Sequence, residues 1–355
     1  MMLKLRRGTV VAVEPLTVEI GAERRRAWAD VGLVGPIEVG DEVIVNTEAV
    51  DLGLGSGGFD VVHANLTRGL EAPGGSKVHV MKLNYTSLQH PVEPVELAEA
   101  PAADSPKPPV LVIPIHGHLA PVAWAASQAT PGLRLGFLQG AGAALSGALS
   151  HDVAELRERG LLCGHVTAGA AYGGEHEAIT LTGGIDAAAR GLDWEAIVVG
   201  PGPGILGSAT HLGHGGMAAL DAAHASLALG LPTLVCPRLS SSDERSRHRG
   251  LSHHSASVLE LLLAPVRVPV PEAELEGWPL LDAEAPKGGS AQAALDALIE
   301  ICSGRHDLAV EPIDLGGYAD TGLPASTMGR SIPEDPLFFA APLAAGRALA
   351  GARAG

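Results

Sequence analysis

One pattern repeats beyond residue 109 and restricts the fold more than any other feature of the chain. A short, continuous apolar run is followed by a loop and then by a segment with helical spacing. Runs without polar alternation are typical of strands that are buried on both faces, and strands that alternate with helices form a mostly parallel sheet. The sequence therefore predicts a three-layer α/β domain, with buried strands within residues 109–115, 133–139, 194–200 and 232–237.

The first 89 residues follow a different pattern, in which short runs rich in β-branched residues are separated by glycine-containing turns. Many short strands of this kind indicate a small β-barrel of the OB or SH3-like type. Residues 90–109 carry six prolines and no apolar periodicity, which is typical of a semi-rigid linker. We therefore expect a β-barrel domain at 1–89, a proline-rich linker at 90–109, and the α/β domain with the candidate site at 110–355.

Local sequence signals predict two helix N-caps and one hairpin within the α/β domain. Ser150 and Ser252 each stand just before a helical segment, where a hydroxyl accepts from a free backbone N–H, so we expect both to be N-caps. The runs at 165–171 and 176–181 flank a Tyr-Gly-Gly-Glu stretch, which predicts a hairpin.

Charge and composition exclude several classes of function. The chain has 40 acidic and 24 basic residues and a formal net charge of −16, which disfavours nucleic acid as a partner. No apolar run approaches the roughly 18–20 residues of a membrane span, and the start of the chain lacks a signal-peptide pattern, so we expect no membrane partner. Three cysteines without a CxxC pair are typical of a reducing compartment, and we expect a cytoplasmic protein. The subunit number stays open, a homo-oligomer included.

Glycine and histidine gather in the loops that follow the predicted strands. Parallel sheets bind ligands beyond the carboxyl ends of their strands, so these loops are expected to share one edge of the sheet. They contain seven of the fifteen histidines: His116, His118, His211, His214, His248, His253 and His254.

The stretch from Arg245 to Ser255 reverses the charge of the chain locally, and it leads into a predicted helix N-terminus. Guanidinium groups and helix N-termini both favour carboxylate or phosphate, so we expect a small anionic metabolite here. Solvated arginines that pair with Asp243 or Glu244 are the alternative. The candidate ligand-binding residues are Gly202, Gly204, Arg238, Arg245, Arg247, Arg249 and His254.

Glycines 202, 204 and 207 also match the spacing of a dinucleotide-binding loop. Nine residues separate this loop from its helix, and Arg238 rather than an acid ends the next strand, so the dinucleotide interpretation is disfavoured. A glycine-proline turn or a cradle of backbone amides for an anion are the other interpretations.

Three histidines, His116, His118 and His253, are the candidates for acid/base catalysis. A metal site built from His116 and His118 with His253, His254 or Asp243 is an alternative, although no metal ligand is assigned. Adjacent residues on a helix diverge by about 100°, so we expect only one of His253 and His254 to face a given site. The sequence leaves the cofactor unknown, and it lacks the GxSxG, GxxxxGK[ST] and HExxH motifs.

Several segments together resemble a bacterial family known as domain of unknown function 3866. They are LRRGTVV, LGLGSGGFDVV, GPGPGILGSATHLGHGG, RHRGLSHHS and STMGRSIPEDPLFFAA. The resemblance runs through nearly the whole chain but implies no activity and no site residue. The sequence thus predicts a protein that binds a small anionic metabolite at the strand ends, as a hydrolase or transferase, with a non-catalytic ligand-binding or regulatory protein as the alternative.

Overall fold

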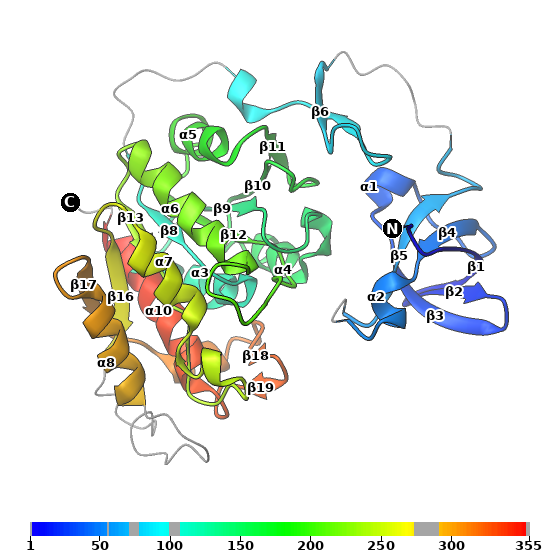
Figure 1. The fold of residues 1–355 in the computed structure, drawn as a ribbon. Helices are drawn as coiled ribbons and strands as arrows, with labels where there is room; N and C mark the ends of the chain where they lie inside the picture. Colours follow the sequence, from blue (N-terminus) through cyan, green and yellow to red (C-terminus); the bar gives the residue numbers. More distant parts are fainter. Residues whose placement is uncertain (1, 55–56, 71–77, 99–106, 273–290, 353–355) are drawn as a thin grey trace. The chain divides into compact units, whose positions relative to one another are not determined.

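The computed structural model describes residues 2–54, 57–70, 78–98, 107–272 and 291–352. They form two compact units, Met1–Val92 and Glu93–Gly355. Figure 1 shows the fold of each unit, coloured along the chain. Within the described ranges, no helix combines the length and the apolar composition that crossing a membrane requires.

The first unit contains a closed barrel of five strands, which confirms the predicted small β-barrel (Figure 1). The strand order is β1-β2-β3-β5-β4, and only β3 and β5 run parallel. Valine and isoleucine side chains fill the interior. The strands are β1 (Leu5–Val13), β2 (Leu16–Ile20), β3 (Glu23–Trp28), β4 (Glu42–Asn46) and β5 (Asp60–Asn65), with short helices α1 (Val31–Val34) and α2 (Glu48–Asp51).

A separate two-stranded ladder, β6 (Val80–Lys82) with β7 (His90–Val92), follows the barrel. The predicted linker at 90–109 is therefore folded at its start, and the Glu96 carboxylate accepts from the backbone N–H of Ile179 at 2.8 Å. Residues 99–106 of that linker lie outside the described residues, and the three-part division of the chain stays a prediction.

The second unit is an α/β domain with one sheet of eight parallel strands, as predicted. The strand order is β11-β10-β9-β12-β8-β13-β16-β17. The strands are β8 (Val110–Val112), β9 (Leu135–Gly140), β10 (Gly164–Ala168), β11 (His176–Ala178), β12 (Ala196–Pro201), β13 (Thr233–Val235), β16 (Arg267–Pro271) and β17 (Asp307–Glu311).

Helices cover both faces of this sheet (Figure 1). Val110 and Val112 of β8 lie in the core beneath one helix layer and Leu111 in the core beneath the other, which explains the continuous apolar runs. One layer holds α5 (Leu181–Gly191), α6 (Ala218–Ala228), α7 (His253–Leu261) and α8 (Ala291–Cys302). The other holds α3 (Leu119–Ala129), α4 (His151–Glu158), α9 (Leu315–Ala319) and α10 (Pro336–Gly351).

Both predicted N-caps are confirmed, and the predicted hairpin is wrong. The Ser150 hydroxyl accepts from the Val153 N–H, and the Ser252 hydroxyl accepts from the His254 N–H. β10 and β11 pair in parallel rather than antiparallel. The loop between them turns through left-handed glycines at Gly169 and Gly173, so the chain re-enters the sheet in the same direction.

The sheet has a topological switch point between β8 and β12. From β8 the chain crosses to β9 on the far side of β12, and from β12 it crosses back to β13 on the far side of β8. Connections that leave in opposite directions open a crevice at the carboxyl ends of such strands, where α/β proteins bind ligands. The loops after β8, β9, β12 and β13 therefore share this edge.

Candidate metal centre

Four histidines from the loops after β12 and β13 meet at this edge, and we call them the histidine cluster: His214, His248, His253 and His254. His214 precedes the 3₁₀ turn η4 (Gly215–Met217), His248 ends the turn η5 (Ser246–His248), and the other two open α7. The ring centroids of His214 and His254 are 3.9 Å apart, and those of His253 and His254 are 4.4 Å apart. One ligand atom from each of His214, His253 and His254 lies within 4.8 Å of the other two.

Ring nitrogens in the cluster are buried without hydrogen-bond partners among the described residues. They are Nδ1 of His214, Nε2 of His253, and both nitrogens of His254. The other nitrogen of His214, Nε2, lies 3.0 Å from the backbone carbonyl of His211. Because a carbonyl only accepts, this contact puts the proton on Nε2 and leaves a lone pair on Nδ1.

The surroundings keep these rings neutral. Burial, assisted by neighbouring rings and arginines, lowers the pKa of His254 to about 2 and that of His248 to about 3. Burial also lowers the pKa values of His214 and His253. Neutral imidazole is the form that binds a metal ion, so the cluster has free lone pairs at neutral pH.

Glycine allows the close approach of the two loops. A Cβ atom on Gly216 would lie 2.9 Å from Nδ1 of His214 and 3.0 Å from Cβ of His254. A Cβ atom on Gly215 would lie 2.1 Å from the carbonyl oxygen of Gly142, in the loop after β9. The glycines after His214 therefore serve to bring its ring against α7.

A buried carboxylate holds the loop that carries His248. Asp243 accepts from Arg245 at 2.9 Å, from Arg238 at 3.3 Å and from Arg330 at 3.5 Å. Arg330 also pairs with the buried Asp335, and we call these five residues the Asp243 network. Burial raises the pKa of Asp243, but the hydrogen bonds and charges of Arg245 and Arg238 outweigh it and hold this pKa well below the ordinary range.

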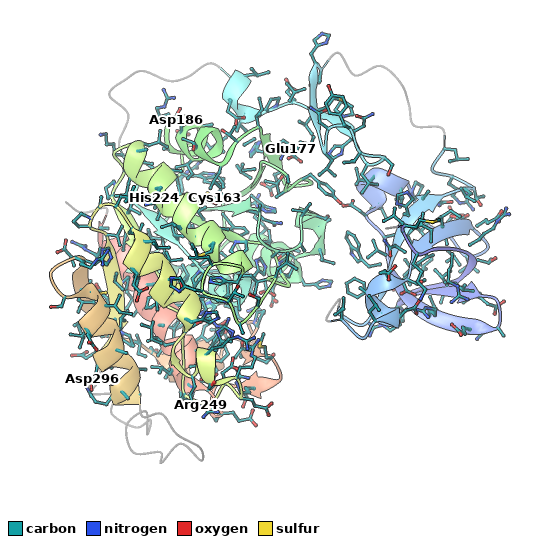
Figure 2. All side chains as sticks on the ribbon, viewed as in Figure 1. Cys163, Glu177, Asp186, His224, Arg249 and Asp296 are labelled. Carbon is teal, nitrogen blue, oxygen red and sulfur yellow. The ribbon has the colours of Figure 1, made fainter. Side chains whose placement is uncertain are left out.

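The predicted anion-binding arginines have different surroundings. Arg245 pairs with Asp243, and Arg249, labelled in Figure 2, donates to the backbone carbonyls of Asp243 and Glu244. Arg238 is 2% exposed and Arg247 is half-buried, and the Nε atoms of both are buried without a partner among the described residues. Arg245 thus pairs with Asp243, as the alternative of a solvated loop predicts, but Asp243 is buried rather than solvated. Arg238 and Arg247 each keep an Nε–H group that no described residue accepts from.

Gly202 and Gly204 make close packing and turn contacts. A Cβ atom on Gly202 would lie 2.5 Å from the Ala144 carbonyl oxygen, and Gly204 has a φ of +74°. These contacts account for both glycines without a bound anion, and their role as amide donors stays a prediction.

His116 and His118 lie in the 3₁₀ turn η2 (His116–His118), not in a continuing strand, and each has partners of its own. His116 bridges the Pro201 carbonyl at 3.0 Å and the Ser150 hydroxyl at 2.7 Å. Nδ1 of His118 lies 3.3 Å from the Cys236 sulfur, and its Nε2 is buried without a partner among the described residues. The metal-capable group of three in the described chain includes neither histidine.

The expectation that only one of His253 and His254 faces a site is wrong. Both occupy the first turn of α7, and their side chains converge on His214. The sequence pattern assigned no role to His214 or His248. Two features of the sequence could have pointed to them: two glycines directly follow His214, and His248 lies five residues before His253.

Replacing Asp243 by Asn removes the negative charge that three guanidinium groups share. We expect the free energy of unfolding to fall by about 3–5 kcal/mol, because breaking a buried pair leaves uncompensated charge. Urea unfolding at pH 7 measures the change. The exposed neighbour provides the control, since Glu244→Gln should change stability by less than about 0.5 kcal/mol. Equal stability of the two variants would show that the network does not hold the loop.

A protein-family model described as "Protein of unknown function (DUF3866)" matches residues 26–346. The matched range includes the histidine cluster and the Asp243 network but not the LRRGTVV segment. No curated protein and no solved structure matches the chain. The match confirms the resemblance found in the sequence, and the chain belongs to the DUF3866 family.

Proposed function

We propose that the histidine cluster holds a divalent transition-metal ion of the zinc type. The observation that carries this proposal is the convergence of three imidazole ligand atoms within 4.8 Å, with buried lone pairs that no described residue satisfies. Buried polar atoms without partners are rare in folded proteins, and a bound ion can satisfy them. Imidazole nitrogen is a preferred ligand of zinc.

The arrangement of the rings fits three ligands after a small movement. The His253 ring is inclined by 64° to His214 and by 54° to His254, so its lone pair approaches from a different direction. The rings of His214 and His254 are stacked at 11°, and one of them must tilt for both to donate in the ring plane. Three protein ligands around zinc leave a fourth position open.

The charge around the cluster favours an anion at that open position. Neutral imidazoles leave the charge of a dication uncompensated, and Arg238 adds positive charge nearby, as its effect on the pKa of His254 shows. Arg247 acts on His253 in the same way. The nearby acid, Asp243, is shared by three arginines. A phosphate or carboxylate group of a small metabolite supplies the missing negative charge.

Hydrolysis is the reaction class that such a site serves. A zinc ion with three imidazole ligands lowers the pKa of bound water to about 7 and polarises a substrate oxygen. The chain itself contributes Arg238 and Arg247, whose free N–H groups would orient the substrate anion, and the buried shell of the cluster, which limits access of water.

Metal binding is tested first. Protein freed of metal by a chelator should bind one zinc ion per chain. His253→Gln and His254→Gln should each lower the affinity by roughly 100-fold or more, because one of three ligands is lost. Calorimetric titration measures the affinity, and far-UV circular dichroism checks the fold. His176→Gln, at an exposed position, is the control and should bind as the parent does. Parent-like affinity in both cluster variants would refute the metal site.

Anion binding is tested on the zinc-loaded protein with inorganic phosphate as the probe. Arg247→Gln should weaken phosphate binding by about ten- to a hundred-fold, since a charge-assisted hydrogen bond contributes about 1.5–3 kcal/mol. Arg249→Gln, two residues away, should change it little because that guanidinium donates to backbone carbonyls. The reverse order of the two effects would move the anion site to Arg249.

A further inference from the structure

A cavity lies between α5 and α6, at the same edge of the sheet. It has a volume of about 190 Å³ and opens at the carboxyl ends of β8, β9, β10 and β12. Its lining includes Gly140, Ala141, Gly169, Asp221 and Ala222, and no histidine. The cavity thus shares no lining residue with the histidine cluster.

The cavity exists because its walls are built from very small residues. Glycine and alanine occupy lining positions on β9, β10, β12 and α6, and the larger apolar residues of the lining are Val112, Ile113, Leu181, Val199 and Pro201. Gly169 adopts a left-handed conformation, and no atom lies within 4 Å of the position that its Cβ would take. Protein interiors contain few voids larger than a water molecule, so an open volume at the switch point of a parallel sheet is characteristic of a ligand site.

The size and polarity of the cavity define the ligand. An apolar cavity of about 150 Å³ is known to accommodate benzene, so this one suits a single substituted ring. Asp221 lies in the first turn of α6 at an exposed position and lines the cavity. Its carboxylate has no hydrogen-bond or ion-pair partner among the described residues. A carboxylate next to an apolar wall favours a ligand with a positively charged donor.

We infer that this cavity binds a small amine with a ring-sized apolar body, the ring against Val112 and Val199 and the ammonium group at Asp221. The cavity and the histidine cluster then select opposite charges, an amine in the cavity and an anion at the cluster. The inference does not rest on the metal centre, because no residue of the cluster lines the cavity.

The experiment compares three probes of one size, benzylamine, benzyl alcohol and benzoate, by ligand-observed NMR titration of the full chain, with and without zinc. We expect benzylamine to bind at least ten-fold more tightly than benzoate, in both metal states. Asp221→Asn should remove this preference and leave the affinity for benzyl alcohol within about two-fold, because only the charge is lost.

Filling the cavity is the decisive variant. Ala222→Leu should abolish binding of all three probes, whereas Ala228→Leu, on the exposed side of the same helix, should leave it unchanged. Ala141→Leu narrows the cavity from an exposed loop position and replaces Ala222→Leu if that variant does not fold. Probe binding that survives both substitutions, a preference for benzoate, or no binding at millimolar concentration would overturn the inference. A role of Asp221 in helix stability alone would lower the unfolding midpoint of Asp221→Asn without changing probe affinity.

Discussion

The buried carboxylate of Asp243 holds the loop that leads into the histidine cluster. Three guanidinium groups reach it from different parts of the chain: Arg238 and Arg245 in the loop after β13, and Arg330 from the β18–β19 ladder (Ser326–Thr327 and Arg330–Ser331). Burial of so many charges carries a large desolvation cost, which only a complete set of partners offsets. Removing one charged partner therefore destabilises the whole Asp243 network. The affected segment includes the loop that contains His248 and leads into α7.

Asp335 completes this arrangement from the other side. It is fully buried, and it accepts from the Ser240 hydroxyl at 2.6 Å and from the Ser241 N–H at 2.8 Å. These contacts fix the start of the loop after β13, as the Arg330 pair fixes its middle. STMGRSIPEDPLFFAA, which marked the family resemblance, contributes Arg330 and Asp335 to this network, and RHRGLSHHS follows Asp243 and Arg245 in the chain. At this edge Asp243 and Asp335 pair with Arg238, Arg245 and Arg330, whereas the buried Nε of Arg247 has no partner among the described residues.

The fold was predictable where one physical effect dominates. Strands buried on both faces produce continuous apolar runs, so β8, β9, β12 and β13 were identified from the sequence, whereas β16 and β17 were not. β16 contains two prolines, and β17 lies at the sheet edge with a half-exposed pattern, so neither has that signal.

The site was predictable only in part. The loops that were predicted to share one edge of the sheet do so, but the sequence did not show that Arg330, 87 positions from Asp243, donates to the same carboxylate. Nor did it show that His214 would close on His253 and His254, because that contact depends on how closely Gly216 lets the loops approach.

X-ray absorption spectroscopy of the zinc-loaded protein tests the central claim most directly, because it reports the atoms bound to the metal. The account predicts nitrogen and oxygen neighbours alone at about 2.0–2.1 Å, with the outer-shell pattern of about three imidazole rings that weakens by one ring in His254→Gln. A sulfur neighbour at about 2.3 Å, or a spectrum without imidazole scattering, would contradict it and place the metal away from the histidine cluster.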